Sequence, residues 1–254
     1  MNALDLTTLR MTFNQGGRQL AAARECEAAV FLEAFGNTEE QLHEEYSEYD
    51  SHSLFLSVED ASGTAWGACR IITPGPAGLK TLNDLGREPW ALDSGRVTRA
   101  ADIDLDRVWD IATIGVRKEA GAKRFLIAMA LFHGIVAASR ANNIPSMVAL
   151  LDERARRLLA SLDYSLSMLP GAQPGEYLGS PSTAPVFGHA STVLSAQRRA
   201  NPDAYRLMTM GIGLDGIALP TAAEYLVATP DNVIPFPVAM PIPAAMPMQV
   251  LVAG

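Results

Sequence analysis

The stretch that decides the fold of this chain is Arg107-Val108-Trp109-Asp110-Ile111-Ala112-Thr113-Ile114-Gly115-Val116-Arg117-Lys118-Glu119-Ala120-Gly121-Ala122-Lys123-Arg124. Its first ten residues are rich in apolar and β-branched side chains and predict a β-strand over 107–116. An almost wholly apolar run then predicts a buried helix over 121–140. The chain is therefore expected to turn sharply from a central strand into a central helix.

The turn between this strand and this helix has the character of an anion site. The first turn of a helix presents unpaired N–H groups and the positive end of its dipole, and both favour phosphate. Small residues let the backbone approach such an anion closely. An ordinary helix start is the alternative. We expect coenzyme A, or the phosphopantetheine of an acyl carrier protein, to contact Ile114, Val116, Arg117, Lys118, Ala120, Gly121, Ala122 and Lys123.

The rest of the chain alternates helical and strand patterns. We expect helices over 17–35, shortly after Thr38, and over 153–161 and 196–210. A hairpin of strands 53–59 and 65–73 precedes a loop-rich insertion over 74–89. Further strands are expected over 146–151, 165–169 and 184–193. This order predicts an α/β fold with a mixed, mostly antiparallel sheet and helices on both faces. Residues 1–210 form the expected domain, and 211–254 a Pro-rich, poorly ordered tail.

Composition excludes several classes of protein. The 254 residues are 48% hydrophobic, enough for a sizeable core, and the net charge of -8 argues against nucleic acid as a partner. Two cysteines do not make a disulfide framework, and the four histidines show no metal-ligand spacing, so no metal is expected. Neither a signal peptide nor an apolar run of about 18 residues is evident, so we expect a cytoplasmic protein without a membrane span.

Several short motifs resemble those of the GNAT acyltransferase superfamily. The turn Arg117-x-x-Ala120-x-Ala122 is similar to the superfamily pattern Arg/Gln-x-x-Gly-x-Gly/Ala, with Ala120 in place of a glycine. Three further motifs, in order, resemble those of the acyl-homoserine-lactone (autoinducer) synthases and the long-chain N-acyl amino acid synthases. They are Glu45-Tyr46-Ser47-Glu48-Tyr49-Asp50, the segment Gly67-Ala68-Cys69-Arg70 with Pro74, and Trp109-Asp110.

The chain departs from those families at informative positions. Ser47 stands where they have a second acid, and Asp110 stands where the third motif has glutamate. Ala112 and Thr113 replace a Ser-Arg pair. Without that arginine, lactone formation and the use of S-adenosylmethionine are disfavoured, and N-acylation of an amine is favoured.

The resemblance implies an N-acyltransferase. It would move an acyl group from a thioester, on coenzyme A or acyl carrier protein, to a small-molecule amine or amino acid. Such a reaction needs a proton acceptor for the amine, and we expect Asp110 to serve. Arg70 is expected to pair with Glu45 or Asp50, which would hold the substrate's ammonium. The structural alternatives are an Asp110 that bonds to backbone or to Arg70, and Arg70, Glu45 and Asp50 on a solvated surface.

Three other functions stay open on the sequence. One is an acetyl-CoA-dependent small-molecule N-acetyltransferase, for which a glycine-rich turn would be stronger evidence than Ala120. Another is an acyl-homoserine-lactone synthase. The last is a non-catalytic GNAT-like module that binds thioesters without turnover.

Overall fold

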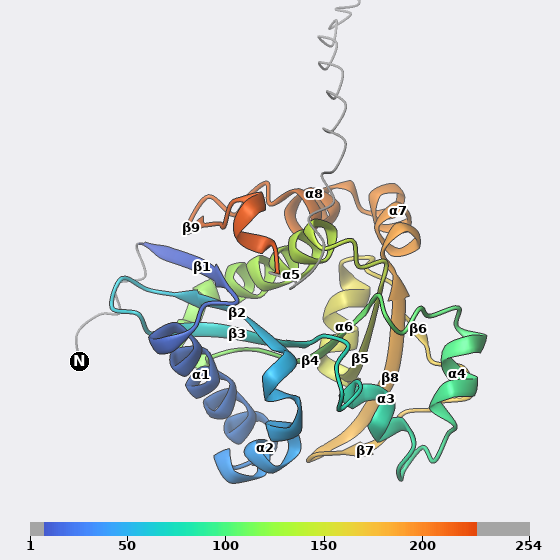
Figure 1. The fold of residues 1–254 in the computed structure, drawn as a ribbon. Helices are drawn as coiled ribbons and strands as arrows, with labels where there is room; N and C mark the ends of the chain where they lie inside the picture. The colour runs from blue at the N-terminus through green and yellow to red at the C-terminus, as the bar shows by residue number, and fades with distance from the viewer. Residues whose placement is uncertain (1–7, 228–254) are drawn as a thin grey trace, which may run out of the picture.

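The computed structural model describes residues 8–227 as one mixed sheet with helices on both faces (Figure 1). The strands are β1 Leu9–Phe13, β2 Ser53–Glu59, β3 Ala65–Ile72, β4 Val108–Val116, β5 Ser146–Asp152, β6 Ser167–Met168, β7 Gly175–Tyr177, β8 Ser180–His189 and β9 Ile217–Ala218. Their order is β6-β8-β5-β4-β3-β2-β1-β9, with β7 also paired to β8. Only the β4–β5 and β1–β9 pairs in this described range are parallel, so the predicted fold class is confirmed.

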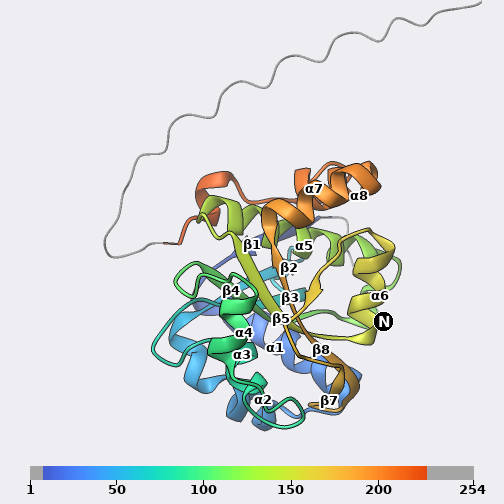
Figure 2. The ribbon, with the colours of Figure 1, turned by 90° about the vertical axis from the view of Figure 1, so that its right-hand side faces the viewer.

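Helices cover the sheet in two groups (Figures 1 and 2). The helices α1 Gly17–Phe35, α2 Glu39–Tyr46, α3 Lys80–Leu85 and α4 Ser94–Ala100 lie on one face. The other face carries α5 Arg124–Ala141, α6 Glu153–Ser161, α7 Ala190–Ala200 and α8 Pro202–Met210. Three 3-10 turns, η1 Ser47–His52, η2 Lys118–Lys123 and η3 Ala222–Tyr225, complete the described secondary structure.

The central helix α5 is apolar on nearly all sides because it is enclosed. It packs on β1 to β4 with one side and against α8 and η3 with the other. Residues 118–141 would be long and apolar enough to cross a membrane by length and composition alone. Burial between the sheet and the C-terminal elements accounts for that composition.

Local sequence signals end and begin the helices over the first face. Gly36 ends α1 with a φ of 76°, a left-handed conformation that favours glycine. Thr38 then starts α2 with a capping box: its hydroxyl accepts from the Gln41 N–H, and the Gln41 side chain accepts from the Thr38 N–H. These caps set the path of the chain from α1 through α2 to the turn η1, whose Asp50 accepts a hydrogen bond from Arg70 of β3.

Two glycines allow both helical layers to approach the sheet closely. A Cβ at Gly67 on β3 would lie 2.6 Å from the Ile127 Cγ2 of α5. A Cβ at Gly115 on β4 would lie 2.4 Å from the Val30 Cγ1 of α1. The sheet is therefore held tightly between α1 and α5 where β4 leads into the turn.

Three of the expected elements are corrected by the structure, which also adds a strand. The insertion at 74–89 is not all loop, because Leu79, Leu82 and Leu85 are buried and α3 forms there. The helix expected over 196–210 is two helices, α7 and α8, since Pro202 starts a new helix behind the cap of Asn201. The strand expected to run to residue 193 ends at His189, and β1 had not been expected.

Residues beyond the expected boundary at 210 also pack on the domain. Strand β9 pairs with β1, and the Tyr225 side chain of η3 is buried against the core. Asn142 at the end of α5 binds the last residues of this segment: its Nδ2 donates to the Tyr225 carbonyl, and its Oδ1 accepts from the Val227 N–H. Residues 211–227 therefore belong to the folded domain, and the Pro-rich part of the expected tail lies outside the described residues.

Candidate active site

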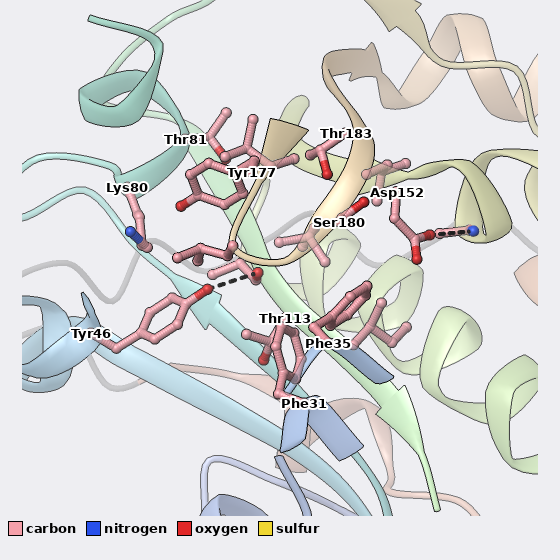
Figure 3. Close-up of a pocket in the computed structure, with 17 residues that line it drawn as sticks. Phe31, Phe35, Tyr46, Lys80, Thr81, Thr113, Asp152, Tyr177, Ser180 and Thr183 are labelled. Carbon is pink, nitrogen blue, oxygen red and sulfur yellow. Dashed lines mark hydrogen bonds between the residues drawn. The ribbon is translucent and has the colours of Figure 1, made fainter. Parts of the chain in front are cut away.

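The centre of the sheet opens where β4 and β5 separate. These strands pair only at Val108–Ser146, Trp109–Met147 and Asp110–Val148. Beyond that point, two cavities lie on opposite sides of the opening and share Ile111, Ile114 and Leu151 in their walls. The polar cavity, on the α1–α3 side, is also lined by Tyr46, Lys80, Thr81, Thr113, Asp152 and Tyr177 (Figure 3). The apolar cavity, on the α5–α6 side, is also lined by Phe132, Ile135, Leu159, Tyr164 and Val186.

Strand β4 carries an irregularity at the opening. Arg70 of β3 pairs with Thr113 and Ile71 pairs with Ile111, so Ala112 has no partner on β3. The Tyr46 hydroxyl donates to the Ala112 carbonyl at 3.4 Å (Figure 3). With this extra residue in the strand, Ala112 and Thr113 both line the polar cavity.

Backbone amides beyond this irregularity point into the opening. The Arg117 N–H donates to the Trp66 carbonyl of β3 at 2.9 Å. Because amide directions alternate along a strand, the N–H groups of Ile114 and Val116 point away from β3, toward the opening. Both residues were predicted to contact the donor. The Arg117 amide was also predicted to do so, but it is used within the sheet.

The side chains of the turn after β4 bind to α1. The Arg117 Nη2 lies 3.1 Å from the Glu25 Oε1, and the Lys118 Nζ lies 2.6 Å from the Glu33 Oε1. Gly121 has a φ of 54°, which favours glycine at this turn. The predicted main-chain cradle, Ala120 to Lys123, thus leads directly into the first turn of α5.

Asp110 is enclosed rather than exposed to the cavity. It has no exposed surface. Its Oδ2 accepts from the Thr81 N–H at 2.6 Å, and its Oδ1 accepts from the Thr81 hydroxyl at 2.8 Å. Burial raises the pKa of Asp110 to about 7, and the Thr81 hydrogen bonds oppose that rise. Thr81 itself lines the polar cavity, so it separates this carboxyl group from any bound substrate.

Lys80, next to Thr81, binds two carboxylates. Its ammonium lies 2.6 Å from the Glu45 Oε2 and 2.9 Å from the Asp84 Oδ2. The Tyr177 hydroxyl donates to the same Asp84 oxygen. Burial is the main cause that raises the pKa of Tyr177 and of Tyr46, so both phenols stay protonated at neutral pH.

Arg70 forms a separate cluster behind β4. Its guanidinium binds Glu27 through two hydrogen bonds, of 3.0 and 2.7 Å, and the Asp50 Oδ1 at 2.9 Å. The Thr113 hydroxyl donates to the Glu27 Oε1 at 2.5 Å. The expected pairing of Arg70 with Asp50 is present, whereas Glu45 binds Lys80 instead. Arg70 does not pair with Asp110.

The predicted residues thus fall into four groups around one opening: the amides of β4 and its turn, Asp110 beside Thr81, Arg70 with Asp50, and Glu45 beside Lys80. Sequence reasoning missed Glu27, Lys80, Thr81, Tyr177 and Asp152. The apolar spacing of Leu79, Leu82 and Leu85 was the signal for α3, which carries Lys80 and Thr81. In residues 8–227 no group of three or more His, Cys, Asp or Glu side chains is placed to hold a metal ion.

Comparison with known proteins identifies the fold of this chain. No family model and no curated protein matches the sequence. Among solved structures, FeeM, an N-acyl amino acid synthase from uncultured soil microbes, is similar with a TM-score of 0.56 and 14% identity, over 74% of this chain and 93% of FeeM. BjaI, a CoA-dependent acyl-homoserine lactone synthase solved with SAM and isopentyl-CoA, is similar with a TM-score of 0.52 and 10% identity, over 85% and 98%. The chain has the GNAT fold, close to that of these two synthases.

Proposed function

We propose that this protein is an N-acyltransferase, which moves an acyl group from a thioester of coenzyme A or acyl carrier protein to the amine of a small molecule. The observation that carries the proposal is the opening between β4 and β5, where a polar and an apolar cavity meet. An acyl thioester has an apolar chain on one side of its carbonyl and a polar carrier arm on the other. The opening accommodates both and leaves the polar cavity for the acceptor.

The amides of β4 suit the donor. The N–H groups of Ile114 and Val116 point into the opening, where they can donate to the carrier arm and to the thioester oxygen. Fixed amide donors stabilise the negative charge that develops on that oxygen during attack. The apolar cavity beside Phe132, Ile135 and Leu159 takes the acyl chain. The carrier's phosphates extend to the turn before α5.

The Asp110–Thr81 pair receives the proton. The amine nitrogen attacks the thioester carbon, the new C–N bond forms, and the C–S bond breaks to release a thiolate that solvent protonates. The amine gives its proton to the Thr81 Oγ1 while the Thr81 hydroxyl proton passes to the Asp110 Oδ1, 2.8 Å away. A carboxyl group with a pKa of about 7 is matched to proton transfer near neutral pH. Asp110 thus accepts the proton through the Thr81 hydroxyl, whereas the sequence predicts that it accepts the proton directly or through a water molecule.

The test is turnover by purified protein with octanoyl-CoA, or octanoyl acyl carrier protein, and tyramine. Release of free thiol and the mass of N-octanoyltyramine report the reaction. We expect Thr81→Val to lower kcat by about 100-fold, the usual scale of a proton-transfer contribution, while Thr81→Ser keeps most activity because it retains the hydroxyl. Thioester binding without any thiol release would refute the transferase and favour a binding module. Equal kcat for the two variants would refute the relay.

A further inference from the structure

The charged side chains in and behind the polar cavity bear on the acceptor of the proposed reaction. Within the described part of the chain, the charged residues in its wall are Lys80 and Asp152. Immediately behind Lys80 lie Glu45 and Asp84, which both bind its ammonium. One ammonium and one carboxylate thus line the cavity, and two further carboxylates lie behind the ammonium and bind it. Arg87 approaches Asp84 at 3.6 Å, but from the solvent side, where its charge is screened.

Lys80 is poorly placed to bind a substrate carboxylate. Two carboxylates already lie within 3 Å of its Nζ, and its side chain is only 4% exposed. The rings of Tyr46 and Tyr177 lie 5.1 and 5.8 Å from the Nζ and enclose it further. A third carboxylate brought to this ammonium would be repelled by the two that hold it.

Arg70 does not provide a cation that could bind a substrate carboxylate. Its guanidinium is bound by Glu27 and Asp50 and lies between the Tyr46 and Phe55 rings, at 4.7 and 4.8 Å. It is 5% exposed and does not line the polar cavity. The guanidinium is thus already bound by two carboxylates of the protein itself.

Asp152 and the aromatic walls offer a place for a cation instead. Asp152 caps α6 through its Oδ1, which accepts from the Ala155 N–H at 2.7 Å, and it stands across the cavity from Lys80 (Figure 3). Phe31, Phe35, Tyr46 and Tyr177 line the same cavity. The faces of aromatic rings attract cations, and their bodies bury apolar groups. The walls match an organic ammonium with an apolar or aromatic body.

We propose that the acceptor is a primary amine that carries no carboxylate and enters the polar cavity as an ammonium ion, which releases one proton to solvent before the neutral nitrogen attacks. The inference rests on the proposed function and narrows its substrate class. FeeM is an N-acyl amino acid synthase, and an amino acid bears a carboxylate. The cavity of this chain instead selects amines over the corresponding amino acids.

The experiment compares acceptors that differ only by the carboxylate. Tyramine and tyrosine form one pair, and cadaverine and lysine form a second. Calorimetry measures the binding of each, and thiol release with octanoyl-CoA measures transfer. We expect the amine of the better-bound pair to bind at least tenfold more tightly than its amino acid. Equal binding, tighter binding of the amino acid, or no binding by any of the four would overturn the inference. Selective amine binding without thiol release would keep it and refute the transferase.

Matched variants of α2 test the electrostatic cause. Glu45→Gln removes one carboxylate from the back of the cavity and keeps a group that can bind Lys80. Glu44→Gln makes the same charge change at an exposed position of the same helix. We expect Glu45→Gln to raise the KM for tyramine about fivefold without changing the KM for octanoyl-CoA, and Glu44→Gln to change neither. An equal effect of both variants, or no effect of Glu45→Gln, would contradict the inference that the charges around the cavity select the acceptor.

Discussion

Arg70 shows how one residue joins four segments. Its ion pairs reach Glu27 on α1 and Asp50 on η1, while Arg70 itself lies on β3. The Thr113 hydroxyl, which donates to Glu27, extends the cluster to β4. Removing one member of a buried pair leaves the partner's charge without compensation, and the loss is large. The cluster thus fixes β4 at the point where the sheet opens.

We predict that Arg70→Ala lowers the free energy of unfolding by about 3–5 kcal/mol. Urea denaturation followed by circular dichroism measures it. Arg24→Ala is the control, because Arg24 binds the same Asp50 but its side chain is 41% exposed. That control should cost less than about 1 kcal/mol. A loss for Arg70→Ala no greater than that of the control would show that the cluster contributes little to the fold.

Asp110 makes stability depend on pH. Its folded pKa of about 7 lies above the ordinary value of about 4, so between these values the folded protein retains a proton that the unfolded chain releases. Stability therefore falls as the pH rises from about 4 to about 7 and levels off above that range.

We predict that Asp110→Asn removes this slope, which reaches about 1.4 kcal/mol per pH unit for one such group. Urea midpoints at pH 5, 6, 7 and 8 measure the difference between the two proteins, since other groups titrate in both. Parallel pH curves for the wild type and Asp110→Asn would show that the carboxyl group is ionised across the range.

At the scale of elements, the strand–turn–helix core was predictable because its signals are local. The apolar run of α5, the β-branched residues of β4 and the Thr38 cap each act within a few residues. α3 was missed because Pro74 to Pro89 contains many breakers, and its three leucines have meaning only against the core that they contact. Glu27 was missed because its partners Arg70 and Thr113 lie 43 and 86 residues away. Contacts between residues far apart in the sequence produce no local spacing pattern from which they could be predicted.

The contact between α1 and β4 also belongs to this scale. We predict that Gly115→Ala lowers the free energy of unfolding by about 1–3 kcal/mol, because the new Cβ would overlap the Val30 side chain. Adding Val30→Ala should restore part of the loss. Gly16→Ala, with nothing within 4 Å of the new Cβ, is the control. Thermal melting of the four proteins measures this, and no recovery in the double variant would place the strain elsewhere.

Over the whole molecule, the segment 211–227 closes the face that α5 would otherwise expose. Tyr225 is 3% exposed and its ring centroid lies 5.7 Å from that of Phe13 on β1. We predict that a chain ending at residue 210 melts roughly 10 °C below a chain ending at 227, the scale expected from losing one buried aromatic anchor and its hydrogen bonds. Differential scanning calorimetry compares the two. Equal melting temperatures would mean that β9 and η3 rest on the core without stabilising it.

The opening between β4 and β5 has a mechanical consequence for the whole molecule. It divides the sheet into two halves, β1 to β4 with β9 and β5 to β8, whose hydrogen-bonded contact is confined to three pairs of residues. Cohesion between the halves therefore also depends on side-chain packing, including that of α3, which contacts both β4 and β5, and on whatever occupies the opening. A thioester arm bonded to the edge of β4 and packed against β5 would act as an additional short strand. If the proposed function is correct, the protein would then be most rigid while it holds the donor and would become less rigid as the spent carrier departs.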